Sequence, residues 1–149
     1  MLISLSIYRE AAAWQTPWSQ DTLKLYSDLP KHQATALFLL RTEVIGLRSW
    51  LASVCVPGIT PECDACNWHE QTVRHVLMMC PKYTDARSLL ISRTSSEELE
   101  QILSRPDTAQ TAARWLVQQG ILKQFETARQ IEEEDTTDHI PFQPLDDVE

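Results

Sequence analysis

Three cysteines and one histidine stand within 18 residues of this chain, in the order C-x2-C-x8-H-x4-C. They are Cys63, Cys66, His75 and Cys80. Three thiolates and one imidazole form a ligand set that closes a tetrahedral structural zinc site. Such a site constrains the fold, because two separate stretches of backbone must converge on one ion. We therefore expect these four residues to bind one structural Zn²⁺.

The two pairs of ligands are predicted to lie on different kinds of backbone. Pro61 precedes the first pair and indicates a loop, whereas residues 72–79 have the composition of a short helix. An α-helix turns by about 100° per residue, so positions five apart do not share a face. His75 and Cys80 can meet at one ion only if Cys80 lies beyond the regular helix. Pro81 disfavours helical backbone at Cys80 and supplies that break.

Other uses of this cluster stay open at the level of sequence. The cysteines could remain reduced without metal, or serve as a disulfide or redox pair. His69 competes as a ligand, but it lies only three residues after Cys66, which is a tight distance for wrapping back to the same ion. Cys55 lies eight residues before Cys63. We expect Cys55 to be a core or helix-end cysteine, with a spare ligand as the alternative.

The acidity of the chain is concentrated at its C-terminal end. The formal net charge is −8, and residues 132–149 hold eight acidic residues and no Lys or Arg. The remaining 131 residues contain 13 acidic and 13 basic residues, so the body of the chain is neutral. A neutral body lacks the basic excess of a strong nucleic-acid-binding protein, so we expect RNA or DNA binding to be weak. The acidic tail is expected to be disordered.

The sequence also indicates the cellular compartment of the protein. It contains no run of roughly 18 apolar residues, so no transmembrane helix and no membrane partner are expected. The apolar stretch Met1–Ile7 has no basic region before it and does not resemble a signal peptide. A metal-type cysteine cluster without a secretion signal favours a reducing compartment. We expect an intracellular protein, either nuclear or cytoplasmic.

Helical periodicity dominates the rest of the chain. In residues 31–54 the apolar positions, with Phe38 and Trp50 among them, recur at spacings of three and four, which predicts one or two amphipathic helices. Arg41 and Arg48 fall off the apolar face, and we expect them in solvent rather than on a phosphate. Residues 83–93 predict a further helix.

Two capping signals predict the helices that follow. Ser95 with Glu98 resembles a capping box that starts a helix through Leu103, and Asp107 with Gln110 repeats the signal. The second helix should end near Gly120, because glycine suits a left-handed cap. No stretch is a convincing strand. The predicted fold class is mainly α, a small helical domain with a zinc-binding loop-helix insert. Its parts are a 1–30 N-terminal extension with short helices, a 31–131 helical domain with the zinc site at 63–80, and the 132–149 tail.

The search for catalytic motifs is negative. The chain has no Gly-rich phosphate loop, no G-x-S-x-G and no H-E-x-x-H. A zinc deaminase would need H-x-E ahead of P-C-x-x-C, and Glu62 separates Pro61 from Cys63. Four protein ligands would also leave no open coordination position for an activated water. We therefore expect the protein not to be an enzyme.

Four segments follow one another along the chain: Leu29–Lys31, Leu39–Leu47, Cys63–Cys66 and Glu70–Tyr83. In this order they resemble the region that follows the ribonuclease H domain in polyproteins of fungal non-LTR retrotransposons. That family carries an LRTG-IGL helix, a CxxC and an ET-xx-H-xxxx-CP helix. The resemblance extends from near Leu29 to near Ile131 and weakens after Arg93. Glu43, where that family commonly has a glycine or a basic residue, and Gln71 depart from it.

The resemblance implies a non-catalytic zinc module, a fragment or relic of a reverse transcriptase polyprotein, that assists template or RNA handling. The Y-x-D-D of a polymerase and the carboxylates of ribonuclease H do not occur in this chain, so those activities do not follow. The alternative is a stand-alone protein-interaction domain in which the zinc is purely structural. The oligomeric state is left open by the sequence.

Overall fold

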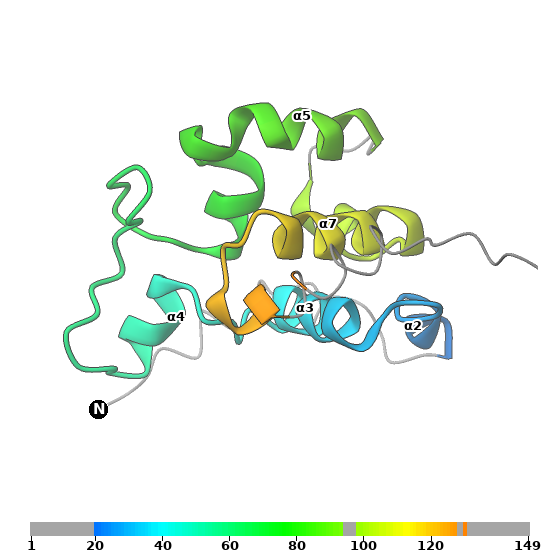
Figure 1. The fold of residues 1–149 in the computed structure, drawn as a ribbon, viewed down its shortest axis with the longest axis horizontal. Coiled ribbons are helices and arrows are strands. Elements are labelled where there is room, and N and C mark those ends of the chain that lie inside the picture. The colour runs from blue at the N-terminus through cyan, green and yellow to red at the C-terminus, as the bar shows by residue number, and fades with distance from the viewer. Residues whose placement is uncertain (1–19, 94–97, 128–129, 131–149) are drawn as a thin grey trace, which may run out of the picture.

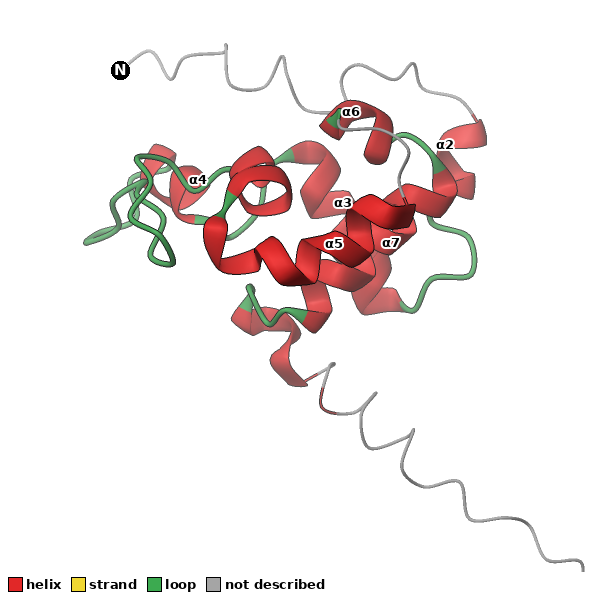
Figure 2. Cartoon of the chain, turned by 90° about the horizontal axis from the view of Figure 1, so that it is seen from above, coloured by secondary structure: helices red, strands yellow, loops and turns green. Residues whose placement is uncertain are grey.

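The computed structural model describes residues 20–93, 98–127 and 130. Within them the secondary structure is helical and no strand occurs, which confirms the predicted mainly α fold class (Figure 2). None of these helices has the length and apolar character required to cross a bilayer. The acidic tail from Glu132 and residues 1–19 of the predicted N-terminal extension lie outside the described residues. The elements are α2 (Gln20–Lys24), α3 (Lys31–Thr42), α4 (Arg48–Ser53), the π-helical turn η2 (His75–Met79), the 3₁₀ turn η3 (Pro81–Tyr83), α5 (Thr84–Arg93), α6 (Leu99–Ile102), α7 (Pro106–Gln118) and the 3₁₀ turn η4 (Lys123–Phe125).

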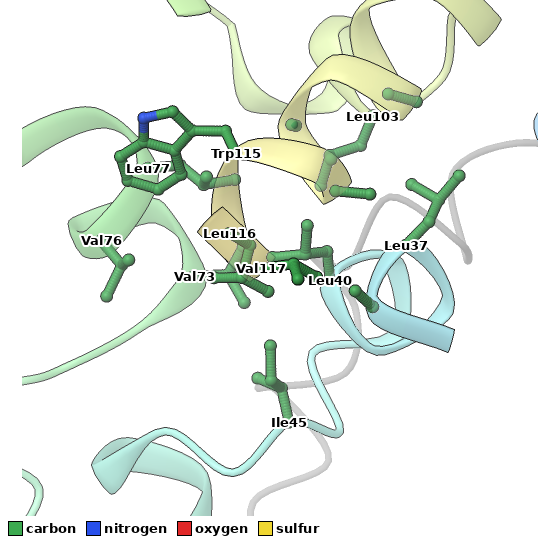
Figure 3. Packing of buried hydrophobic residues seen from close by; sticks show 14 of the residues in the cluster. Leu37, Leu40, Ile45, Val73, Val76, Leu77, Leu103, Trp115, Leu116 and Val117 are labelled. Carbon is green, nitrogen blue, oxygen red and sulfur yellow. The ribbon is translucent and has the colours of Figure 1, made fainter. Parts of the chain in front are cut away.

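The centre of the fold is the contact between α3 and α7, with α5 on the other side of α7 (Figure 1). Leu37 and Leu40 of α3 and Leu116 of α7 are fully buried there (Figure 3). Ala109 and Ala112 are also fully buried, and their small side chains let the two helices approach closely. Burying one leucine side chain contributes about 1.5–3 kcal/mol, so this interface is a main source of stability that is independent of the metal site.

The core extends beyond these two helices at both ends. Leu25, which follows α2, is buried in the same cluster. Gln110 of α7 donates from Nε2 to the carbonyl oxygens of Leu25 and Ser27, at 3.3 and 3.0 Å. Val76 and Leu77 of η2 are buried from the opposite side, and Figure 3 shows them near Trp115. The turn that carries His75 is therefore anchored in the core by its apolar neighbours.

The predicted 31–54 segment forms two helices with a break between them. α3 ends at Thr42, and Glu43 has φ 59°, in the left-handed region that costs a residue with a side chain about 1–2 kcal/mol. Gly46 lies in the connection before α4, and not inside a helix. The left-handed backbone explains why a glycine would suit position 43.

Two side chains of α3 lie opposite to their predicted sides. Phe38, expected in the core, is 54% exposed, whereas Arg41, expected in solvent, is only 2% exposed. α7 covers only one side of α3, and the apolar pattern of the sequence was wider than the covered face. Arg48 is half-buried and donates from Nη2 to Thr60 Oγ1 at 2.9 Å. The buried face of α3 consists of Gln33, Ala36, Leu37, Leu40 and Arg41.

Both predicted capping signals are wrong in position. Glu98 is the residue before α6, with extended backbone at φ −95° and ψ 121°, so it cannot occupy the third helical position; Ser95 lies outside the described residues. α7 begins at Pro106, one residue before the predicted cap Asp107. Proline suits the first helical position because its φ is already helical and it lacks an N–H. The predicted end of α7 is confirmed, since Gly120 has φ 62°.

Candidate metal centre

The structure brings the four predicted ligands together between the metal loop, residues 54–71, and η2. Their candidate ligand atoms all lie within 4.8 Å of one another. Cys66 Sγ is 3.2 Å from His75 Nε2, and Cys63 Sγ is 4.0 Å from Cys80 Sγ. Cys63, His75 and Cys80 are buried and Cys66 is half-buried. The cluster could hold a metal ion.

A tight turn presents Cys63 and Cys66. The N–H of Cys63 donates to Trp68 O at 2.8 Å, and the N–H of Asn67 donates to Cys63 O at 2.7 Å. Asn67 takes the left-handed conformation, with φ 59°, which asparagine tolerates better than most residues. The chain therefore doubles back directly after Cys66, and both thiols of the pair face the same point.

A π-helical turn brings Cys80 to His75. The N–H of Cys80 donates to His75 O at 2.7 Å, so this turn contains one residue more than an α-helical turn. Cys80 itself is extended, with φ −60° and ψ 121°. The prediction that Cys80 lies beyond the helix is confirmed, and residues 73–79 are helical as predicted, but the turn from His75 to Met79 is π-helical and not α-helical. The wider turn, together with the break before Pro81, places residues five apart on one side.

The first turn before η2 has a side-chain cap. Thr72 Oγ1 accepts a hydrogen bond from the N–H of His75 at 3.1 Å. This is the bond that an N-cap residue forms with the third residue of a helix. It fixes the backbone of a ligand residue directly.

Arg87 of α5 holds the other end of this turn. Its side chain is 6% exposed, and its Nε donates to Leu77 O at 2.8 Å. Its Nη2 donates to Cys80 O at 2.7 Å and to Val76 O at 3.4 Å. These carbonyl groups lie where the helix ends and carbonyls lack helical partners; Cys80 O also accepts a hydrogen bond from the N–H of Tyr83 at 3.2 Å. Arg87 therefore fixes the backbone that carries Cys80 by charge-assisted hydrogen bonds.

Sequence reasoning made no prediction for Arg87. A signal was present. Arg87 lies four residues after Tyr83 and three before Leu90, two positions on the inward face of the predicted helix. A cation on an inward face needs acceptors, and the end of a preceding helix provides them.

Gln71 attaches the metal loop to α4. Its Nε2 donates to Asp64 Oδ1 at 2.8 Å and lies 3.7 Å from Cys63 Sγ, within reach of a weak hydrogen bond. Its Oε1 accepts a hydrogen bond from the N–H of Arg48 at 3.0 Å. The buried amide therefore contacts a ligand residue and the first turn of a helix at once. The sequence singled out Gln71 only as a departure from the resembled family.

Burial and crowding set the protonation of the cluster. Burial, followed by the hydrogen bond with Cys66 and the charge of Cys63, raises the pKa of Cys80 to about 11. Burial also raises the pKa of Cys63, but hydrogen bonds from the Ala65 and Cys66 N–H groups outweigh it, so that pKa lies below its usual value. Burial, followed by the charges of Arg87 and His69, lowers the pKa of His75. Neutral imidazole is the form that binds metals, and the crowded thiols could all ionise only beside a cation.

His69 and Cys55 lie outside the cluster. His69 is exposed, and its ring lies against Trp68, with centroids 4.7 Å apart. Trp68 in turn lies parallel to His75, with centroids 6.1 Å apart and an interplanar angle of 4°. Cys55 is exposed just after the C-cap of α4, so of the two predicted positions, core or helix end, the structure has the helix end.

The fold and the site define a small helical module with a Cys₃His cluster that could bind a metal ion. Comparisons of the chain with protein-family models, with curated proteins and with solved structures found no match.

Proposed function

We propose that the chain is a non-catalytic helical module that one Zn²⁺ stabilises through Cys63, Cys66, His75 and Cys80. The observation that supports this proposal is the convergence of four ligand atoms within 4.8 Å. Sulfur ligands about 2.3 Å from a tetrahedral zinc ion lie roughly 3.8 Å apart. The 4.0 Å between Cys63 Sγ and Cys80 Sγ is close to that separation. Three thiols and one neutral imidazole also form a donor set typical of structural zinc.

The resemblance to the region after ribonuclease H supports a second part of the proposal. In this part the module is a fragment or relic of a retrotransposon polyprotein, and its role there is handling RNA or DNA. Decayed reverse transcriptase coding sequence beside its reading frame would support that origin. The alternative, a stand-alone protein-interaction domain, is favoured by Phe38, a large apolar side chain that is 54% exposed on α3.

Purified under reducing conditions, the protein is expected to carry one zinc per chain. Cys80→Ser should weaken zinc binding by more than about 100-fold, which exceeds the usual effect of losing an outer-shell partner. Elemental analysis and competition with a chromophoric chelator measure both quantities. Cys55→Ser is the matched control and should retain one zinc, because Cys55 is exposed and outside the cluster. Absence of zinc from the wild-type protein, or equal loss in both variants, would refute this ligand set.

Zinc affinity is expected to rise with pH. A zinc ligand must be a thiolate, but the pKa of Cys80 in the metal-free protein is raised to about 11, so near neutral pH this thiol carries a proton. A proton must leave when the metal binds, so low pH favours the metal-free state and high pH the bound state. Chelator competition between about pH 7 and pH 9, corrected for the chelator's own titration, should show tighter binding at the higher pH. Constant affinity over that range would mean that the thiols are already ionised.

A further inference from the structure

A cleft of about 680 Å³ lies beside the metal loop. One wall comes from the start of α4 and the metal loop, where Arg48, Ile59 and Asp64 line it. The other wall comes from η3 and from residues 119–124, which follow α7 and lead into η4, with Lys82 and Lys123 in the lining. Segments distant in the sequence therefore form one concave surface next to the metal centre.

The charge in this cleft is predominantly positive. Arg48, Lys82 and Lys123 line it, and Asp64 is the acidic residue among its lining residues. Within the described residues none of these three cations forms a salt bridge, and the buried Nε of Arg48 has no hydrogen-bond partner there. Positive charge around a concave surface raises the local concentration of anions. Lys24, Arg74 and Arg105 form salt bridges with Asp21, Glu100 and Asp107, whereas Lys31 and Arg114, like the cleft cations, form none within the described residues.

We propose that this cleft binds a single-stranded nucleic acid, with its phosphates on Arg48, Lys82 and Lys123. This inference rests on the nucleic-acid role in the proposed function and names the surface that performs it. The lining also contains apolar side chains, among them Ile59 and Ile121, so a nucleotide can place its base on them while its phosphate contacts the cations. A single strand can turn its bases outward into such a cleft, whereas a duplex keeps them stacked.

Lys82→Gln/Lys123→Gln is the decisive variant. Both side chains are exposed, so the substitution removes two cations without opening the core. The full-length zinc-loaded protein is titrated into a fluorescein-labelled oligouridylate, and anisotropy is followed at several salt concentrations. Three phosphate contacts predict a slope of log K against log[salt] of about −2, and one remaining contact predicts about −0.7. Affinity at the lowest salt should fall by about tenfold or more in the variant.

Lys24→Gln/Lys31→Gln is the matched control, since it removes two exposed lysines outside the cleft. It should change the slope and the affinity by less than about twofold, because only phosphate contacts release counterions. Equal weakening in both variants, or no weakening in the cleft variant, would refute the cleft as the binding surface but not the nucleic-acid role. A wild-type protein that fails to bind the oligonucleotide even at low salt would refute the nucleic-acid role itself, while zinc content would still support the structural centre. An oligoglutamate peptide that binds more tightly than the oligonucleotide would assign the cleft to an acidic protein and overturn the proposal.

Discussion

Removal of the metal by a chelator is expected to unfold the metal loop while α3 and α7 stay folded. Val56 and Trp68 of this loop are exposed, and Ile59 is only half-buried. Packing of these residues cannot offset an ordering cost of about 1–2 kcal/mol per residue. Structural zinc contributes roughly 10–16 kcal/mol of binding free energy in small zinc-finger peptides, so we expect the ion to offset most of the entropy cost of ordering the loop. Hydrogen exchange with and without chelator should show protection lost over residues 55–71.

The turn that carries His75 should lose less hydrogen-exchange protection on zinc removal than the metal loop does. Val73, Val76 and Leu77 are buried in the core, so their packing holds residues 73–77 in part without the ion. α3 and α7 should keep nearly all of their protection, since their interface contains no ligand. Full protection over residues 56–71 after complete zinc removal would show that packing orders the loop. Simultaneous loss in all helices would instead show that the whole fold depends on the metal.

Arg87→Met is expected to weaken zinc binding and to destabilise the protein by roughly 2–5 kcal/mol, because it removes the hydrogen bonds that a buried charged group donates to the carbonyls of Val76, Leu77 and Cys80. Methionine replaces much of the volume of the arginine stem but none of its hydrogen bonds. Arg87 binds the carbonyl oxygens of Leu77 and Cys80 most closely, so the backbone of the fourth ligand loses its support. Thermal unfolding and zinc competition measure the two effects.

The visible absorption of the Co²⁺-substituted protein distinguishes a role of Arg87 in positioning Cys80 from a general loss of stability. If Arg87 positions Cys80, the spectrum of Arg87→Met should depart from the tetrahedral pattern even where the protein is folded. Arg87→Lys should recover only part of the effect, because one ammonium group cannot reproduce the fork of the guanidinium. Arg114→Met is the control, since Arg114 is exposed on α7. Unchanged zinc affinity and an unchanged cobalt spectrum in Arg87→Met would refute the positioning role.

The metal cluster was predictable because its chemistry is local in the sequence. Few residue types bind metals, and the four candidates lie within 18 residues with Pro81 beside the last. Geometry alone then required Cys80 to leave the helix, and its extended backbone agrees with that requirement. The π-helical form of the turn was not predictable, because a sequence pattern does not distinguish a five-residue turn from a helix that simply stops.

The helices were predictable as elements, but their faces and starts were not. Periodicity identifies apolar positions in α3, yet only the placement of α7 decides that Arg41 is buried and Phe38 exposed. The prediction of where α7 starts was wrong for a different reason. Pro106 and Asp107 both suit a helix N-terminus, but the capping pattern relied on the aspartate alone. Arg87 was missed because its acceptors are backbone carbonyls, and a sequence does not show which carbonyls lie near a given side chain.

The two halves of the metal site differ in how much variation in chain length they can absorb. Between Cys66 and Gln71 the chain runs through the exposed residues 67–70, and a longer surface loop there costs little closure entropy. Between His75 and Cys80 a single π-helical turn sets the register, and a hydrogen bond joins its two ends. One residue more or less there would rotate Cys80 away from the other ligands by about 100°. Among divergent copies of such a chain, insertions and deletions should accumulate in the loop and be excluded from the turn.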